Sequence, residues 1–516
     1  MIRAQSLVMA AALFAAAGCG GSVLIGKDGK IDPKHDSGQK DRTGRSVSKA
    51  AAAGFNTALD EFSAHDKKQD WQEDVCKSVA ESFLAASKEQ QSATGKPLAE
   101  AVYNAGLSYQ RCGKDSDARS QFEAAIRADG SMHRAKAQIV LYDFNKGTDL
   151  DTTIQQLDTI IRDAKFQNAE ALVALASLQM ERGGDQPDQD GKTDLERAQR
   201  NLQRALAVDD SYMPAFNQLA IYYLELARAK SGQESGRTKG KRGRRKLVAS
   251  SSKHVDVNSQ QLDLAALVAS QAQKKNPNYA PIHNTSGLIQ VELQNFNGAV
   301  KSFGRARQLD PKFFEAHMNY AAVNLSFRGF SEAEKAYREA LRLRPNEYEA
   351  HLGLALALRG QINDGNFDKY VAESEKELAA AKKIDGQRPE AYYNEAILTQ
   401  EYKAKRGNAV TSLEKAARQY DDFIGKAGGD AAFADAVKRA KDRTQDIRDT
   451  IKFIKEGEQA AKDAPPPPPP PGKGAPPAPD AKGGDAKGGD AKGADAKGAD
   501  AKGAPPPPAK PPEKKK

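Results

Sequence analysis

Small, aromatic and proline residues recur with a period of 34 residues between Ala280 and Glu347, in two abutting units. Each unit has a small residue at positions 8, 20 and 27, an aromatic residue at position 24 and a proline at position 32. In chain order these are Gly287, Ala299, Phe303, Ala306 and Pro311, then Ala321, Ala333, Tyr337, Ala340 and Pro345. Small residues let two helices approach closely, the aromatic ring fills the gap to the next unit, and proline ends the second helix. The pattern therefore predicts stacked pairs of helices.

The same frame extends in both directions, with single positions replaced. About eight units are predicted, at 99–132, 133–168, 169–212, 213–279, 280–313, 314–347, 348–388 and 389–422. The unit at 133–168 is degenerate, and a long insertion at 229–258, rich in Gly, Ser and Lys, is predicted to be disordered. Residues 50–98 are predicted to form a helical N-terminal cap and residues 423–463 a charged C-terminal capping helix, because the ends of a solenoid must be sealed.

These positions resemble the pattern of the tetratricopeptide (TPR) repeat over roughly residues 99–422. The resemblance implies an all-α protein, a right-handed TPR superhelical solenoid with helical caps and disordered termini. It also implies a scaffold that binds other proteins and is not an enzyme. The motif is specific to the fold and carries no information about the ligand.

The first nineteen residues have the pattern of a secretory signal. Arg3 precedes an apolar run from Leu7 to Ala17, and small residues lead to Cys19. The cysteine directly after Ala-Gly makes the segment resemble a bacterial lipoprotein signal. An ordinary signal peptide with a chance cysteine is the alternative interpretation.

The lipoprotein resemblance implies that residues 1–18 are removed and that Cys19 is acylated. Three acyl chains at about 0.8 kcal/mol per buried CH₂ would make the anchor permanent. Gly20 stands where an aspartate would retain a lipoprotein in the inner membrane. We therefore expect an outer-membrane lipoprotein facing the periplasm, with residues 19–49 as a flexible tether.

The net charge of +9 is concentrated in two segments. Residues 229–253 carry a net charge of +8 and residues 464–516 a net charge of +4, so the remainder is slightly acidic. The basic cluster of the insertion consists of Lys239, Lys241, Arg242, Arg244, Arg245 and Lys246. It has no interleaved aromatic residues for stacking bases, and a location outside the cytoplasm argues against nucleic acid. An anionic envelope partner, such as peptidoglycan or anionic lipid, and a merely solvated insertion both stay open.

The tail, residues 464–516, begins with a run of seven prolines and continues with five Asp-Ala-Lys-Gly-(Gly/Ala) repeats. This composition cannot form a core. A spacer through the peptidoglycan layer and a ligand for a groove that binds polyproline II helices are the two interpretations.

Three histidines share repeat position 4: His283, His317 and His351. Equivalent positions of stacked units lie about 10 Å or more apart, because packed helices are about 8–10 Å apart. One zinc ion needs every ligand nitrogen at about 2.1 Å. The histidines are therefore predicted to be helix-packing residues, and the sequence predicts no metal, no cofactor and no catalytic site.

Cys76 and Cys112 remain as the other cysteines. An envelope location permits a disulfide between them, and two separately buried cysteines are the alternative.

The first helix of each TPR unit lines the groove in which TPR proteins bind ligands. Candidate groove residues are Tyr103, Asn217, Asn284, Met318, Leu352, Arg359 and Tyr393. An apolar groove with amide groups suits an extended peptide or an amphipathic helix. In the alternative interpretation these residues pack within the solenoid.

Signal, tether, repeats, basic insertion and tail together resemble the TPR lipoproteins of the myxobacterial adventurous gliding motility machinery. The resemblance implies a scaffold that binds envelope proteins in a gliding-motility complex. Two alternatives stay open: an assembly factor for outer-membrane or pilus proteins, and an enzyme or enzyme regulator acting on peptidoglycan.

Overall fold

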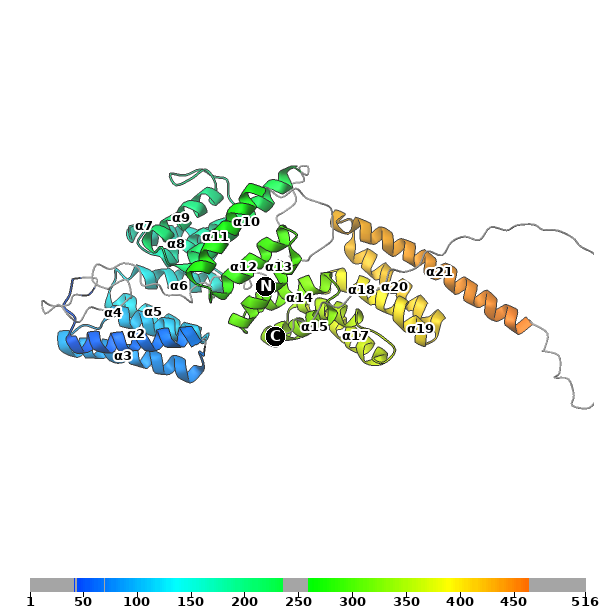
Figure 1. Cartoon of the computed structure of the whole chain (residues 1–516), viewed down its shortest axis with the longest axis horizontal. Helices are drawn as coiled ribbons and strands as arrows, with labels where there is room; N and C mark the ends of the chain where they lie inside the picture. Colours follow the sequence, from blue (N-terminus) through cyan, green and yellow to red (C-terminus); the bar gives the residue numbers. More distant parts are fainter. Residues whose placement is uncertain (1–40, 42–43, 69, 235–258, 464–516) are drawn as a thin grey trace, which may run out of the picture. The chain divides into compact units, whose positions relative to one another are not determined.

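The computed structural model describes residues 41, 44–68, 70–234 and 259–463. All regular elements in these ranges are helical, apart from isolated bridge residues such as the pair Asp188 and Gly191. The chain divides into two compact units, Met1–Ile454 and Lys455–Lys516. The second unit contributes only the end of the last helix to the described residues (Figure 1). None of the described helices combines the length and apolar character that crossing a bilayer requires.

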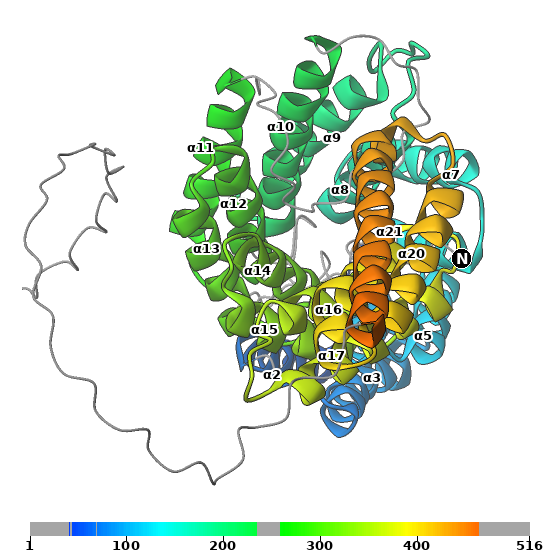
Figure 2. The same ribbon diagram turned by 90° about the vertical axis from the view of Figure 1, so that its right-hand side faces the viewer.

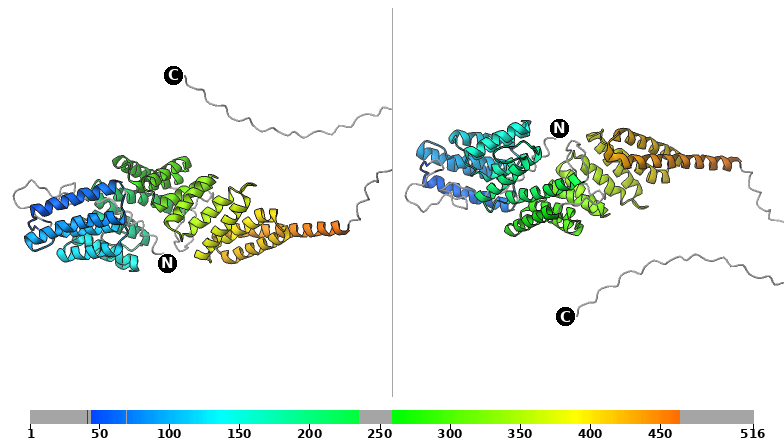
Figure 3. Two further views of the ribbon diagram at one scale, coloured as in Figure 1. Left: turned by 90° about the horizontal axis from the view of Figure 1, so that it is seen from below. Right: turned by 90° about the horizontal axis from the view of Figure 1, so that it is seen from above.

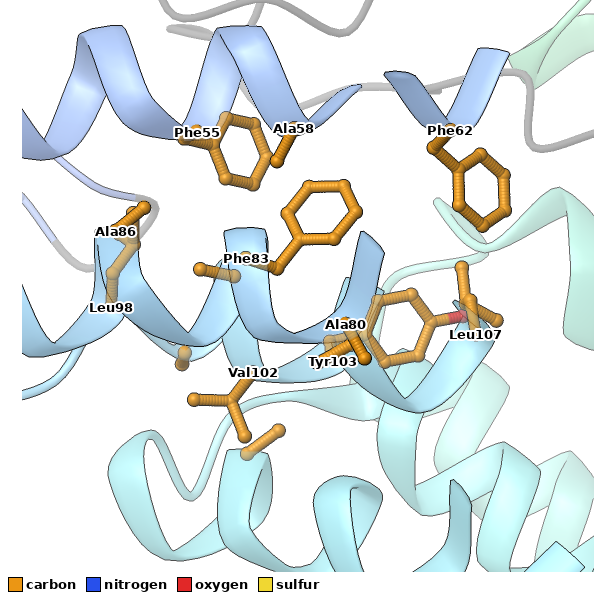
Figure 4. Close-up of a cluster of buried hydrophobic side chains, with 14 of the residues drawn as sticks. Phe55, Ala58, Phe62, Ala80, Phe83, Ala86, Leu98, Val102, Tyr103 and Leu107 are labelled. Atoms are coloured by element: carbon orange, nitrogen blue, oxygen red, sulfur yellow. The ribbon is translucent and has the colours of Figure 1, made fainter. Parts of the chain in front are cut away.

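The side chains between the N-terminal helices form one buried hydrophobic cluster. They are α2 (Lys49–Lys68), α3 (Glu73–Thr94), α4 (Ala99–Arg111) and α5 (Asp115–Ala128), and each packs against the next up to α5. Phe55 on α2 and Phe83 on α3 lie with ring centroids 5.6 Å apart, beside Phe62 (Figure 4). The range predicted as a cap is thus occupied by the α2–α3 pair, which buries aromatic rings against α4.

The central helices come in pairs. They are α6 (His133–Lys146), α7 (Leu150–Asp163), α8 (Ala169–Arg182), α9 (Asp194–Val208), α10 (Met213–Glu234) and α11 (Ser259–Lys275). The degenerate unit at 133–168 is therefore a helix pair, α6 and α7. The predicted start of the long insertion was wrong, because α10 continues through residues 229–234. Ala, Lys, Gln and Glu in this stretch are good helix formers, which accounts for the continuation.

Six helices follow in the most regular part of the chain. They are α12 (Ala280–Glu292), α13 (Phe296–Leu309), α14 (Phe314–Ser326), α15 (Phe330–Leu343), α16 (Tyr348–Arg359) and α17 (Phe367–Ile384). Gly287 on α12 faces the buried ring of Phe303 on α13, so closely that a Cβ atom would stand 2.5 Å from it. Ala299 and Ala306 are fully buried. The periodic small and aromatic residues therefore hold the two helices of this pair together, as the spacing predicts.

The C-terminal helices are less regular. They are α18 (Glu390–Leu398), the π-helical turn η1 (Thr399–Lys403), α19 (Ala404–Arg406), α20 (Ala409–Ala427), the 3₁₀ turn η2 (Ala431–Phe433) and α21 (Ala434–Asp463). The predicted start of the capping helix at residue 423 was wrong, because α20 runs to Ala427 and α21 begins at Ala434. Gly428 takes a φ of +54°, a conformation that favours glycine, and ends α20 there.

Packing between consecutive pairs follows one rule. The second helix of a pair packs against the first helix of the next, as α13 does against α14 and α15 against α16 (Figure 2). First helices also contact one another in the sequence α6, α8, α10, α12, α14, α16 and α18. We call this row of first helices the inner layer. Figure 3 gives two further views of the helices, coloured in chain order. Stacked pairs with these contacts make the described body an all-α TPR solenoid, as the repeat pattern predicts.

Candidate functional site

The candidate groove residues all lie on first helices of the pairs. Tyr103 is on α4, Asn217 on α10, Asn284 on α12, Met318 on α14, Leu352 and Arg359 on α16, and Tyr393 on α18. Their exposure divides them into two groups. Tyr103, Asn217 and Asn284 are buried, whereas the other four are partly exposed.

The two buried asparagines join neighbouring first helices. Asn217 Oδ1 accepts a hydrogen bond of 2.7 Å from the hydroxyl of Thr285, and Asn284 Oδ1 accepts one of 2.9 Å from Asn319 Nδ2. Buried amides need such partners, because an unsatisfied polar group is costly. These bonds between first helices favour the alternative interpretation, in which Asn217 and Asn284 pack within the solenoid.

Tyr103 belongs to a buried polar cluster, which favours the alternative interpretation that it packs within the solenoid. Its hydroxyl donates to Glu170 Oε2 at 3.0 Å, and Gln138 Nε2 donates to Glu170 Oε1 at 3.0 Å. The guanidinium of Arg134 lies 5.0 Å from the centroid of the Tyr103 ring. Burial and the Glu170 carboxylate raise the pKa of Tyr103, so the phenol stays a neutral donor.

Met318, Leu352 and Tyr393 give the inner layer an accessible apolar character. Met318 and Leu352 are half-buried at the edges of two hydrophobic clusters. The ring of Tyr393 packs 4.9 Å from that of Phe423, with part of its surface exposed. Half-burial leaves one side of each residue free to contact a partner, and α14, α16 and α18 are neighbours in the inner layer.

Arg359 differs from the rest of the candidate set because it is a cation. Its Nη1 donates to the side-chain oxygen of Asn394 at 3.0 Å and to the backbone carbonyl of Asn394 at 3.3 Å. It forms no ion pair with any described carboxylate. Burial lowers the pKa of Arg359.

The position-4 histidines each contact the end of the preceding helix pair. His283 Nε2 lies 2.8 Å from the carbonyl oxygen of Pro277. His317 Nε2 lies 3.0 Å from that of Pro311, and His351 Nε2 lies 2.9 Å from that of Pro345. Each histidine therefore has its own local partner. The described ranges contain no cluster of three or more His, Cys, Asp or Glu side chains suited to a metal ion.

The two remaining cysteines are joined in the structure. Cys76 on α3 and Cys112 at the end of α4 form a disulfide, with their Cα atoms 6.3 Å apart. Cys19 and the tail at 464–516 lie outside the described residues, as does the basic cluster of the insertion, which consists of Lys239, Lys241, Arg242, Arg244, Arg245 and Lys246.

The sequence did not reveal the ionic cluster in the loop between α8 and α9. Asp194 is fully buried and accepts hydrogen bonds from Arg182 at 2.7 Å, Arg197 at 2.6 Å and the backbone N–H of Gly184 at 2.6 Å. These bonds offset the cost of burying its charge and lower its pKa. The only sequence signal was the density of Asp and Arg at both ends of the loop, which is also typical of a solvated surface.

Comparison with known proteins gives similarity at the level of solved structures alone. No family model matches the chain, and no curated protein matches its sequence. The structure of PilF of Pseudomonas aeruginosa is 15% identical, with a TM-score of 0.37, over 54% of this chain and 99% of that protein. A TPR protein of Parabacteroides merdae is 15% identical, with a TM-score of 0.34, over 60% and 99% of the two chains. YrrB, described as a TPR protein with an unusual peptide-binding site, is 17% identical, with a TM-score of 0.31, over 46% and 97%.

Proposed function

We propose that this chain is a TPR scaffold that binds a segment of a partner protein on its inner layer and catalyses no reaction. The observation that supports the proposal is the arrangement of Met318, Leu352 and Tyr393 on the adjacent helices α14, α16 and α18, each partly exposed. An extended peptide or an amphipathic helix presents apolar side chains at intervals that fit such a row.

We place the scaffold in the cell envelope, anchored at the outer membrane through acylated Cys19. The support is the signal-like pattern of residues 1–19. The resemblance to gliding-motility TPR lipoproteins favours a role in the gliding machinery, with envelope proteins as partners. The basic cluster of the insertion would add contacts to peptidoglycan or anionic lipid.

The inner-layer proposal is tested by changing its apolar residues. The variant Met318→Lys/Leu352→Lys places two charges in the row, and Leu267→Lys is the control, because Leu267 is a leucine 54% exposed on the second helix α11. Partners are cross-linked in cells and quantified by mass spectrometry after purification from detergent-solubilised envelopes. We expect the double variant to lose specific partners that the wild type and Leu267→Lys retain. Equal recovery from all three folded proteins would refute binding on this surface.

The anchor is tested separately with Cys19→Ser. We expect the wild type to incorporate labelled palmitate and to fractionate with outer membranes, and Cys19→Ser to do neither. Membrane association that persists without label in the wild type would show that an acyl chain is not the anchor.

A further inference from the structure

Two exposed apolar side chains occupy the same position in neighbouring units. Leu293 directly follows α12 and is 43% exposed, and Phe327 directly follows α14 and is 56% exposed. They stand 34 residues apart in the sequence. The ring of Phe296, the first residue of α13, is partly exposed, and its centroid lies 4.5 Å from that of Phe327. The turns α12–α13 and α14–α15 therefore share an apolar surface, Leu293, Phe296 and Phe327, which we call the turn patch.

The residue that follows each exposed side chain has a backbone conformation that favours glycine. Five equivalent turns of the solenoid have a positive φ at this position, and the first three have glycine there: Gly113, Gly147 and Gly183. The other two are Gln294 and Arg328, with φ values of +57° and +60°. A side chain in this conformation costs free energy, so stability alone would favour glycine at both positions. Strained residues of this kind are concentrated at binding sites.

Backbone hydrogen bonds hold both turns in the same shape. The N–H of Asn295 donates to the carbonyl oxygen of Gln290 at 2.8 Å, and the N–H of Gly329 donates to that of Asn324 at 2.8 Å. The exposed side chains are therefore presented by turns that are already ordered. Binding through them has a smaller entropic cost than binding through a loop that must be ordered first.

The charge at the two turns is positive. Arg328 is exposed and forms no ion pair with a described residue. The acidic residues of both turns are paired, because Glu292 accepts a hydrogen bond of 2.7 Å from Arg228, and Glu332 accepts one of 2.8 Å from Lys335. The charge of Arg328 is therefore uncompensated beside the apolar rings, which favours an anionic partner.

The contact between Arg228 and Glu292 also brings a strongly basic part of the sequence to this place. Glu292 directly precedes Leu293, so Arg228 on α10 lies beside the turn patch. Residues 229–253, which directly follow Arg228 in the sequence, carry a net charge of +8. Clustered positive charge attracts an anionic surface over about a Debye length. The partner that fits these features offers many negative charges and an apolar interior.

We propose that the turn patch is a membrane-contact surface, with Leu293 and Phe327 inserted into an anionic lipid bilayer and Arg328 bound to lipid phosphate. Apolar side chains beside cations are typical of surfaces that lie in the headgroup region of a bilayer. A guanidinium binds phosphate through two parallel hydrogen bonds. The proposal goes beyond the proposed function, because it needs neither an acyl chain on Cys19 nor a peptide on the inner layer.

Vesicle binding is the first experiment. The mature-length chain with Cys19→Ser, folded as judged by circular dichroism, has no acylation site, so any binding comes from the protein itself. Its flotation is measured with vesicles of equal parts phosphatidylglycerol and phosphatidylcholine, and with vesicles of phosphatidylcholine alone. We expect strong binding to the anionic vesicles and little to the neutral ones. No binding to anionic vesicles would overturn this inference and leave the scaffold and the acyl anchor, which are tested in cells, unaffected.

Variants of the same chain separate the patch from the basic segment. We expect Leu293→Ser/Phe327→Ser to weaken binding to anionic vesicles by roughly 10-fold or more, since apolar area is no longer buried. Arg328→Gln should weaken it by about fivefold, as for one cation near a charged membrane. The control Leu267→Ser, at a leucine 54% exposed on α11, should bind as the parent does. Equal binding by all folded variants would mean that the basic segment alone binds lipid, and the proposal would be wrong.

A fluorescent reporter tests insertion directly and keeps the proposal testable if the double variant does not fold. The only tryptophan of the chain, Trp71, is buried, so a second tryptophan can be followed by difference. Phe327→Trp is compared with the control Leu267→Trp on vesicles whose acyl chains carry bromine, which quenches a tryptophan in contact with them. We expect the added emission of Phe327→Trp to shift to shorter wavelength and to be quenched, and that of Leu267→Trp to stay unchanged. Absence of quenching in Phe327→Trp, or equal quenching in both, would show that the turn patch does not enter the bilayer.

Discussion

His317 Nε2 lies 3.0 Å from the carbonyl oxygen of Pro311, six residues earlier in the chain. The proline follows the second helix of one pair, and the histidine lies in the first helix of the next. His283 and His351 make the same contact with Pro277 and Pro345. The imidazole thus fixes the turn between consecutive pairs, which gives the 34-residue spacing of the histidines a structural explanation.

Replacing His317 by Phe should destabilise the solenoid modestly. The side chain is buried, so Phe keeps most of the packing but removes the donor to the Pro311 carbonyl. We expect the free energy of unfolding to fall by about 1 kcal/mol, measured by urea unfolding followed by circular dichroism. His317→Gln, which keeps a donor, should lose less. If His317→Phe were as stable as the wild type, the hydrogen bond would have no net role.

Stability around His351 should depend on pH. Its Nδ1 lies 2.5 Å from Glu377 Oε2, and this hydrogen bond raises the pKa of His351 above its ordinary value of 6.5. The folded state then holds the proton more tightly than the unfolded state, so the stabilisation is present below pH 6.5 and is lost as pH rises through the raised pKa. We expect the wild type to exceed Glu377→Gln in melting temperature at about pH 5.5–6, and by less at about pH 8.

The test compares the melting temperatures of the wild type and Glu377→Gln, because other histidines change the stability of the wild type with pH in the opposite direction. Burial lowers the pKa values of His283 and His317. Their unfolded forms bind protons first as pH falls below 6.5, so they destabilise the fold on acidification. A difference between the two proteins that stays constant with pH would show that the pair of His351 and Glu377 does not titrate as proposed.

Two glycines of one helix pair should respond oppositely to alanine. A Cβ atom at Gly287 would stand 2.5 Å from the buried ring of Phe303, whereas at Gly304 the nearest atom is 3.6 Å away, on Tyr320. We expect Gly287→Ala to cost about 1–3 kcal/mol by overpacking. Gly304→Ala should stabilise α13 by about 0.5–1 kcal/mol, because alanine is the better helix former. The melting temperatures of both variants, compared with that of the wild type, test this expectation. Similar changes at the two sites would contradict the packing described.

The fold was predictable because its determinants are local and repeated. Gly287 and Phe303 lie sixteen residues apart in one pair, and their equivalents recur in the next, so a single sequence displays the rule twice. The ends of helices were less predictable. Gly428 ends α20 after the repeats, where no period applies, and α10 extends into a segment with an insertion-like composition.

The candidate site was predictable only in part, because exposure depends on contacts between distant units. Asn217 accepts a hydrogen bond from Thr285, 68 residues away in the sequence, and Tyr103 donates one to Glu170, 67 residues away. Periodicity places these residues on first helices but does not state how closely those helices approach. Arg359 stood out in the sequence as a cation among aliphatic positions. Its hydrogen bond to Asn394 on the next first helix emerged only from the structure.

Removing the disulfide should have the largest effect on stability. Cys76 and Cys112 are 36 residues apart in sequence, and closing such a loop stabilises the fold by about 4 kcal/mol in the chain-entropy model. In a Cys19→Ser background, Cys76→Ala/Cys112→Ala should therefore melt well below the parent protein. Reductant should lower the melting temperature of the parent to that of the double variant and leave the double variant unchanged. A parent protein that shows two free thiols by mass spectrometry after alkylation, and no response to reductant, would mean that the two cysteines are not bridged in solution.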